Sequence, residues 1–321
     1  MKILLVIDGS SSSEMATRTL KALRLPPQTE ITVMTVVPEH TFLGGITLGK
    51  ARDASVKNET QQQRAADLIR GPVQAISTSR FKVRSMVQWG DPAKIILNTA
   101  RESGASLVVM GAKGLTDSPQ FLLGSVAQKV MKYAKASVLL VRDKPAAMTL
   151  ASGTKSKTAA INRVLLATDG SKYSDMVIQF LLSLPLPRHS QVVVITALQS
   201  YLAAWMKMPT FDLQTNQELL ANLQASEESE ARKILTRVEE QFQARKYKTA
   251  SVVMRGGAAE SILKAAKVHE PDIIALGGRG LTPVKALLLG SVAERVARYA
   301  NCSVLIGRAH NVDNWTSNDL K

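Results

Sequence analysis

The chain has 321 residues, of which 45% are hydrophobic and 21% charged, so a packed core can form and a wholly disordered chain is excluded. Lys and Arg outnumber Asp and Glu by 41 to 26, which favours anionic partners such as phosphates, nucleic acid or acidic surfaces. The single cysteine, Cys302, excludes an intrachain disulfide and a site with several thiolate ligands. The amino-terminal apolar run is too short for a signal peptide and no stretch suits a membrane helix, so we expect a soluble, cytoplasmic protein without a membrane partner.

The sequence contains an internal repeat. The segment Ile3–Ser10 (ILLVIDGS) returns 161 residues later as Val164–Ser171 (VLLATDGS), and Leu123–Ala127 (LGSVA) returns 166 residues later. The difference in spacing requires an insertion before the third strand of the second half, and the repeat is too long for a solenoid unit. We therefore predict two domains at 1–143 and 161–309, joined by a linker at 144–160 and followed by a flexible tail at 310–321.

In chain order, each half reads as strand, helix, strand, long loop and helix, strand, helix, strand, helix, strand. Strands of the first half are expected at four apolar runs bounded by polar residues or glycine: Lys2–Ile7, Ile31–Val37, Leu107–Met110 and Val138–Val141. Asp91 and Pro92 are typical of the N-cap and first residue of a helix. In the second half one expected helical stripe comprises Tyr173, Val177, Phe180 and Leu184, and a second comprises Leu220, Leu223, Ala231, Ile234, Val238 and Phe242.

This alternation predicts an α/β fold: two tandem doubly wound, Rossmann-like domains, each with a five-stranded, mostly parallel sheet. The last strands, Ser137–Arg142 and Ser303–Arg308, are expected to pair antiparallel and to join the halves as an intramolecular pseudo-dimer. Ligands of such sheets bind beyond the carboxyl ends of the strands, at the point where the strand order reverses. In each half this point lies between the first and fourth strands.

A glycine pattern, G-x2-G-x9-G-S, occurs at that point in both halves. It comprises Gly111, Gly114, Gly124 and Ser125 in the first half and Gly277, Gly280, Gly290 and Ser291 in the second. Glycines there would let the backbone approach a phosphate, and Gly-Ser would open a helix whose amino end favours an anion. Lys113 and Arg279 add positive charge within the turns. The alternative interpretation is ordinary turn glycines followed by a capping serine, but the repetition favours phosphate binding.

Asp8 and Asp169 end the first strand of each half, at the edge of the same expected crevice. A carboxylate there would accept hydrogen bonds from ribose hydroxyls, as an acidic residue does in related nucleotide-binding sheets. The alternative is that each aspartate caps the following helix through the Gly-Ser that comes after it. The position at the expected ligand crevice favours the first interpretation.

With these motifs the chain resembles the universal stress proteins in their tandem-domain, ATP-binding form. The resemblance implies phosphate contact by Gly111, Gly114, Gly124, Ser125 and Val126, and in the second half by Gly277, Gly280, Gly290, Ser291 and Val292. It also implies ribose or adenine contact by Asp8 and Asp169, and adenine recognition by backbone groups near Val36 and Ala197. The turn position that is often histidine in the family is Lys113 or Arg279 here. The implied cofactor is ATP or another adenine nucleotide, with Mg²⁺ or Mn²⁺.

Other signals are weaker. The segment Gly44–Ala51 lacks the Ser or Thr that closes a P-loop and is interpreted as a loop over the crevice. The four histidines are scattered, so we expect neither a metal site built by the protein nor a Ser-His-Asp triad. The aromatic and methionine-rich segment 201–211 is interpreted as a loop packed on its own domain, with a lid or partner surface as the alternative.

The sequence therefore predicts a stress-linked regulatory protein that binds an adenine nucleotide in each half and is read by an unidentified protein partner, with a homodimer as a further possibility. The loops 38–57 and 199–215 are the expected moving parts. One alternative is a slow ATP hydrolase or phosphotransferase, although no dedicated base is evident and we assign no catalytic residue. Another is a basic nucleic-acid-binding protein, which we do not favour because the positive charge is spread over both halves.

Overall fold

The computed structural model describes residues 1–38, 54–114, 123–142, 161–184, 186–198, 217–280 and 289–308. Five predictions therefore fall wholly or mainly outside the described residues. They concern the linker 144–160, the tail 310–321, the P-loop-like segment 44–51, the aromatic segment 201–211, and the loops 38–57 and 199–215.

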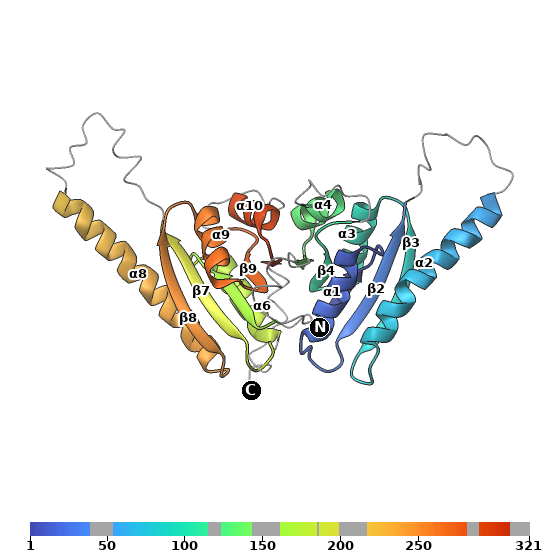
Figure 1. Ribbon diagram of the computed structural model, residues 1–321, viewed down its shortest axis with the longest axis horizontal. Helices are drawn as coiled ribbons and strands as arrows, with labels where there is room; N and C mark the ends of the chain where they lie inside the picture. The colour runs from blue at the N-terminus through green and yellow to red at the C-terminus, as the bar shows by residue number, and fades with distance from the viewer. Residues whose placement is uncertain are drawn as a thin grey trace, which may run out of the picture.

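The expected alternation of strands and helices is present in both halves (Figure 1). The first half comprises β1 (Lys2–Val6), α1 (Ser11–Ala22), β2 (Glu30–Val37), α2 (Ala54–Ile76), β3 (Lys82–Trp89), α3 (Pro92–Glu102), β4 (Leu107–Gly111), α4 (Ser125–Tyr133) and β5 (Ser137–Val141). The second half comprises β6 (Arg163–Ala167), α6 (Lys172–Ser183), β7 (Gln191–Leu198), α8 (Gln217–Gln243), β8 (Lys248–Arg255), α9 (Ala258–His269), β9 (Ile273–Gly277), α10 (Ser291–Tyr299) and β10 (Ser303–Gly307).

The strands form a single ten-stranded sheet in the order β3-β2-β1-β4-β5-β10-β9-β6-β7-β8. All neighbours within a half are parallel, so the predicted doubly wound α/β fold is confirmed. The order reverses between β1 and β4 and between β6 and β9, as expected. The two halves meet through β5 and β10, which pair antiparallel with Leu139 opposite Leu305, so the expected junction is also present.

Each face of the sheet buries one apolar core that runs through both halves. Residues of α1, α2, α6 and α8 pack on one face, and residues of α3, α4, α9 and α10 pack on the other. Figure 1 shows the two halves side by side, with α4 and α10 next to each other at the centre and α2 and α8 on the outside. Burial of both faces explains why the inner strands are continuous apolar runs.

Local sequence signals explain the starts of α1, α3 and α6. Asp91 caps α3 through its side chain, which accepts a hydrogen bond from the backbone of Lys94 at 2.8 Å, and Pro92 follows at the first helical position, as expected. Ser10 and Ser171 cap α1 and α6 in the same way.

The apolar stripe predicted for α8 is correct only in part. Ala231, Val238 and Phe242 are buried, but Leu223 is 41% exposed. The amino-terminal half of α8 projects past the strands in Figure 1, so the periodicity continues where no sheet lies beneath it. In the described residues no helix is both long and apolar enough to cross a membrane.

Candidate functional site

The turn after the first strand of each half is held by its aspartate. Asp8 Oδ1 accepts hydrogen bonds from the backbone N–H of Ser10 at 3.0 Å and from Ser10 Oγ at 2.6 Å. Asp169 Oδ1 accepts from the backbone N–H of Ser171 at 3.0 Å. The N-cap is the serine, and each aspartate supports the start of the helix through the Gly-Ser that follows it, as the alternative interpretation predicts. Each carboxylate thereby fixes the Asp-Gly-Ser turn at the carboxyl edge of the sheet.

The first glycine of each G-x2-G turn is needed for packing between a strand and a helix. A methyl group built on Gly111 would lie 2.8 Å from Ser12 Cβ in α1, and one built on Gly277 would lie 3.0 Å from Tyr173 O in α6. The phosphate interpretation of the sequence predicts that these glycines leave room for a ligand. The space that a side chain would fill is occupied by α1 in the first half and by α6 in the second, so these glycines let the helix pack closely against the strand end.

The second glycine of the turn lies next to the aspartate in the second half. A methyl group on Gly280 would lie 2.8 Å from Asp169 Oδ2. In the first half, Ser10 Oγ donates to the backbone oxygen of Lys113 at 3.4 Å, which brings the Asp-Gly-Ser turn and the glycine turn together, one residue before Gly114. In each half the fold thus joins two segments that are about a hundred residues apart in sequence.

The glycine-serine pairs open α4 and α10 as expected. Gly124 and Gly290 are N-caps without a side-chain cap, and their own N–H groups donate at 2.8 Å to Ala112 O and Gly278 O. Those two amides are therefore used within the protein. Ser125 and Ser291 are exposed, and Val126 and Val292 are half-buried against the core. The amides of a first helical turn have no intrahelical acceptor, so these four residues supply the N–H groups that an anion can use.

An aromatic side chain orients the cation of the second glycine turn. The guanidinium of Arg279 lies over the ring of Tyr173, 5.5 Å from its centroid, and Lys172 Nζ lies 5.4 Å from the same centroid. The residues at the matching positions of the first half are Ser11 and Ser12. The glycine motif predicts Arg279 as a site residue but not Tyr173 or Lys172, although both differ from the residues at the matching positions of the first half.

Val36 and Ala197 lie near the carboxyl ends of β2 and β7. Each is two residues beyond the last residue of its strand that pairs with β1 or β6, which is Met34 in β2 and Ile195 in β7. Met34 O accepts from Ile7 N at 2.8 Å, and alternate residues of a strand direct their backbone groups to the same side. The backbone of Val36 therefore faces the gap beyond the end of β1.

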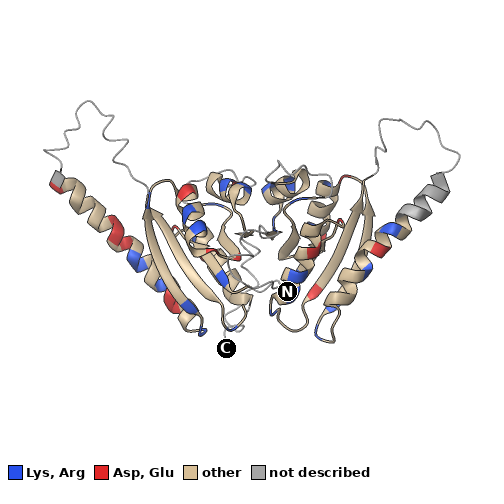
Figure 2. Cartoon of the chain, in the orientation of Figure 1, with Lys and Arg blue, Asp and Glu red and all other residues tan. Residues whose placement is uncertain are grey.

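The described residues contain no cluster of three or more His, Cys, Asp or Glu side chains that could hold a metal ion. Lys and Arg residues are distributed over helices and strands of both halves in Figure 2.

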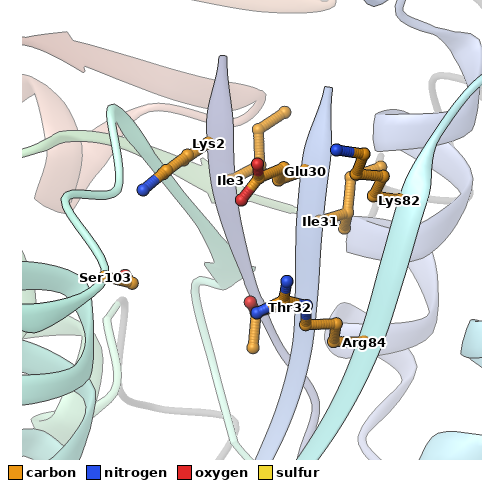
Figure 3. A pocket seen from close by; sticks show the side chains of 8 residues that line it. All are labelled: Lys2, Ile3, Glu30, Ile31, Thr32, Lys82, Arg84 and Ser103. Atoms are coloured by element: carbon orange, nitrogen blue, oxygen red, sulfur yellow. The ribbon is translucent and has the colours of Figure 1, made fainter. Parts of the chain in front are cut away.

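A separate groove of about 120 Å³ lies at the opposite edge of the sheet, near the amino ends of β1, β2 and β3 (Figure 3). Its lining includes Lys2, Glu30, Lys82, Arg84 and Ser103, and none of the predicted site residues. Lys2, Lys82 and Arg84 are exposed, so the charge of this groove is solvated. The groove is distinct from the candidate site.

Comparison with known proteins identifies the family of this chain. The profile of the Universal stress protein family matches residues 1–142 and 160–308. The chain belongs to the universal stress protein family. Universal stress protein YxiE of Bacillus subtilis is 27% identical over 146 residues, which are 44% of this chain and 98% of that protein. This universal stress protein therefore has about twice the length of that relative.

Solved structures also match the fold. A universal stress protein from Archaeoglobus fulgidus covers 96% of this chain and 98% of its own with a TM-score of 0.60 and 19% identity, which supports the tandem architecture. A universal stress protein solved in complex with cAMP matches 46% of this chain and 98% of its own with 21% identity and a TM-score of 0.30. The cAMP is bound by that neighbouring protein.

Proposed function

We propose that the protein binds one adenine nucleotide, with ATP as the preferred one, at the carboxyl edge of each half of the sheet. We also propose that occupancy of these sites serves stress-linked regulation. Membership of the universal stress protein family supports the regulatory role. The observation that carries the nucleotide proposal is the repeated arrangement in which an uncapped helix start adjoins a turn that bears a cation: Gly124 with Lys113, and Gly290 with Arg279.

The proposed division of roles follows from these positions. First-turn amides of α4 and α10, with Ser125 Oγ and Ser291 Oγ, would bind phosphate oxygens. Asp8 and Asp169 would accept hydrogen bonds from the ribose while holding their own turns. Backbone groups of Val36 and Ala197 would bind the adenine edge. Gly111 and Gly277 would contribute through close packing rather than through direct contact, because α1 and α6 fill the space beside them.

Isothermal titration of the purified chain with ATP, AMP and cAMP, each with and without Mg²⁺, tests this proposal. Ser125→Asp and Ser291→Asp should each abolish one site, because a carboxylate in the first turn repels phosphate while it suits the helix dipole. Phosphate release measured on the same samples separates binding from hydrolysis, and a steep loss of oligonucleotide binding with salt would instead favour the nucleic-acid alternative. Nucleotide binding that both variants retain would contradict the assignment.

A further inference from the structure

Two arginines tie each half to the other at the central strand pair. Arg142 follows β5 and Arg308 follows β10. The backbone N–H of Arg142 donates to Ser303 Oγ at 3.3 Å, and that of Arg308 donates to Ser137 Oγ at 3.2 Å. The two contacts are reciprocal, as at the interface of a two-fold symmetric dimer.

Each guanidinium also reaches the last turn of a helix in the opposite half. Arg308 Nη2 donates to Met131 O and, at 3.3 Å, to Lys132 O of α4. Arg142 Nη2 donates to Ala297 O at 2.5 Å and to Arg298 O at 3.4 Å in α10. The last carbonyls of a helix lack intrahelical donors and carry partial negative charge, so a cation stabilises that end. These helices are the two whose amino ends form the candidate phosphate sites.

Arg308 lies, in addition, against the glycine turn of its own half. A methyl group on Gly278 would lie 3.4 Å from Arg308 Cγ, and Gly278 N donates to Gly307 O at 2.8 Å. Burial, and after it the positive charge of Arg279, lower the pKa of Arg308 to about 10. Arg279 and Arg308 thus repel each other at the place where the glycine turn of the second half adjoins Arg308, the residue that contacts α4.

We propose that Arg308 is a positioning residue that makes nucleotide binding in the first half depend on the occupancy of the second, an inference that rests on the proposed function. A phosphate beside Arg279 offsets its repulsion of Arg308. Arg308 then binds the carbonyls of α4 more firmly, and the amino end of α4 is held in place for the phosphate of the first half. Binding at the two sites is therefore positively coupled, and the same factor applies in both directions.

Calorimetric titration with ATP of the unaltered protein and of the Ser291→Asp variant tests the inference, because only the first site can bind in the variant. First-site affinity should be about 5-fold tighter in the unaltered protein at saturation, the lower end of typical allosteric coupling, and Arg308→Gln should remove this difference. Arg308→Lys should give a smaller loss, since it keeps the charge but not the planar fork that reaches two carbonyls. Arg188→Gln removes one exposed positive charge from the same half and should leave the affinity unchanged.

Hydrogen exchange without nucleotide gives a second readout. Arg308→Gln should raise amide exchange in α4 and leave α10 unchanged, and Arg142→Gln should do the reverse. If Arg308→Gln fails to fold, the unaltered protein at saturation and the Ser291→Asp variant still decide the question. Positive coupling requires the first site to bind ATP more tightly in the unaltered protein. Unchanged first-site affinity in a protein that binds two nucleotides overturns this inference alone, whereas no binding to the unaltered protein overturns the proposed function as well.

Discussion

Asp169 and Gly280 meet at the carboxyl edge of the second half of the sheet, where a methyl group on Gly280 would lie 2.8 Å from Asp169 Oδ2. The same carboxylate accepts the backbone N–H of Ser171 through Oδ1. The glycine turn and the Asp-Gly-Ser turn are therefore in contact, and a change in one alters the geometry of the other.

Gly280→Ala should displace the Asp169 carboxylate and weaken nucleotide binding in the second half about 10-fold, which corresponds to about 1.4 kcal/mol. The first half should be unaffected. Titration calorimetry in the Ser125→Asp background isolates the relevant site. Gly71→Ala is the matched control, because nothing lies within 4 Å of a methyl group there. Equal affinity in the Gly280→Ala and Gly71→Ala variants would argue against a role for Asp169 in binding.

Gly277→Ala should destabilise the fold by about 1–3 kcal/mol, the usual cost of overpacking. The added methyl group would lie 2.9 Å from Arg279 O and 3.0 Å from Tyr173 O, which are backbone atoms that cannot move cheaply. At Gly290 the nearest atoms would be 3.4 Å away, an ordinary contact, so Gly290→Ala should leave stability within about 0.5 kcal/mol. Urea unfolding measures both changes, and similar stability of the two variants would show that the packing argument is wrong.

Tyr173→Ser introduces the residue that the first half has at the matching position. It removes the ring beneath Arg279, a contact typically worth about 0.5–1 kcal/mol at an exposed site. Second-site affinity for ATP should fall about 2- to 5-fold, in line with that energy. Tyr133→Ser, which changes a half-exposed tyrosine at the end of α4, serves as the control. A second site that binds equally well without Tyr173 would mean that the ring does not position Arg279.

Leu223→Glu and Val238→Glu should differ sharply although both residues lie on the stripe predicted for α8. Leu223 is 41% exposed, so the first change should alter the free energy of unfolding by less than about 0.5 kcal/mol. Val238 is fully buried, so the second places a charge in the core and should cost more than about 4 kcal/mol or prevent folding. Thermal unfolding distinguishes them, and a large loss in Leu223→Glu would indicate that a partner or segment covers that face.

The sequence was sufficient for the fold because its signals are local. Apolar runs such as Leu107–Met110 mark strands buried on both faces, and Asp91 with Pro92 marks a helix start. In the first half only the third strand, β3, was predicted by its place in the order and without a range, because an outer strand that is half-exposed on its faces has a mixed composition.

The positions of the candidate site residues could be predicted from the sequence, but the contacts that these residues make could not. Repetition of the glycine pattern identified the two turns, but the packing role of Gly111 and Gly277 depends on α1 and α6, which local sequence does not reveal. The contacts of Arg142 and Arg308 join residues more than 150 positions apart. No spacing rule relates such residues, so their role emerged only from the paired strands.

The stoichiometry of nucleotide binding tests the central claim most directly. Titration calorimetry of the full chain with ATP should give two nucleotides per chain, one in each of the Ser125→Asp and Ser291→Asp variants, and none in the double variant. A full-length, folded protein that binds no adenine nucleotide, or a double variant that still binds two, would contradict the account.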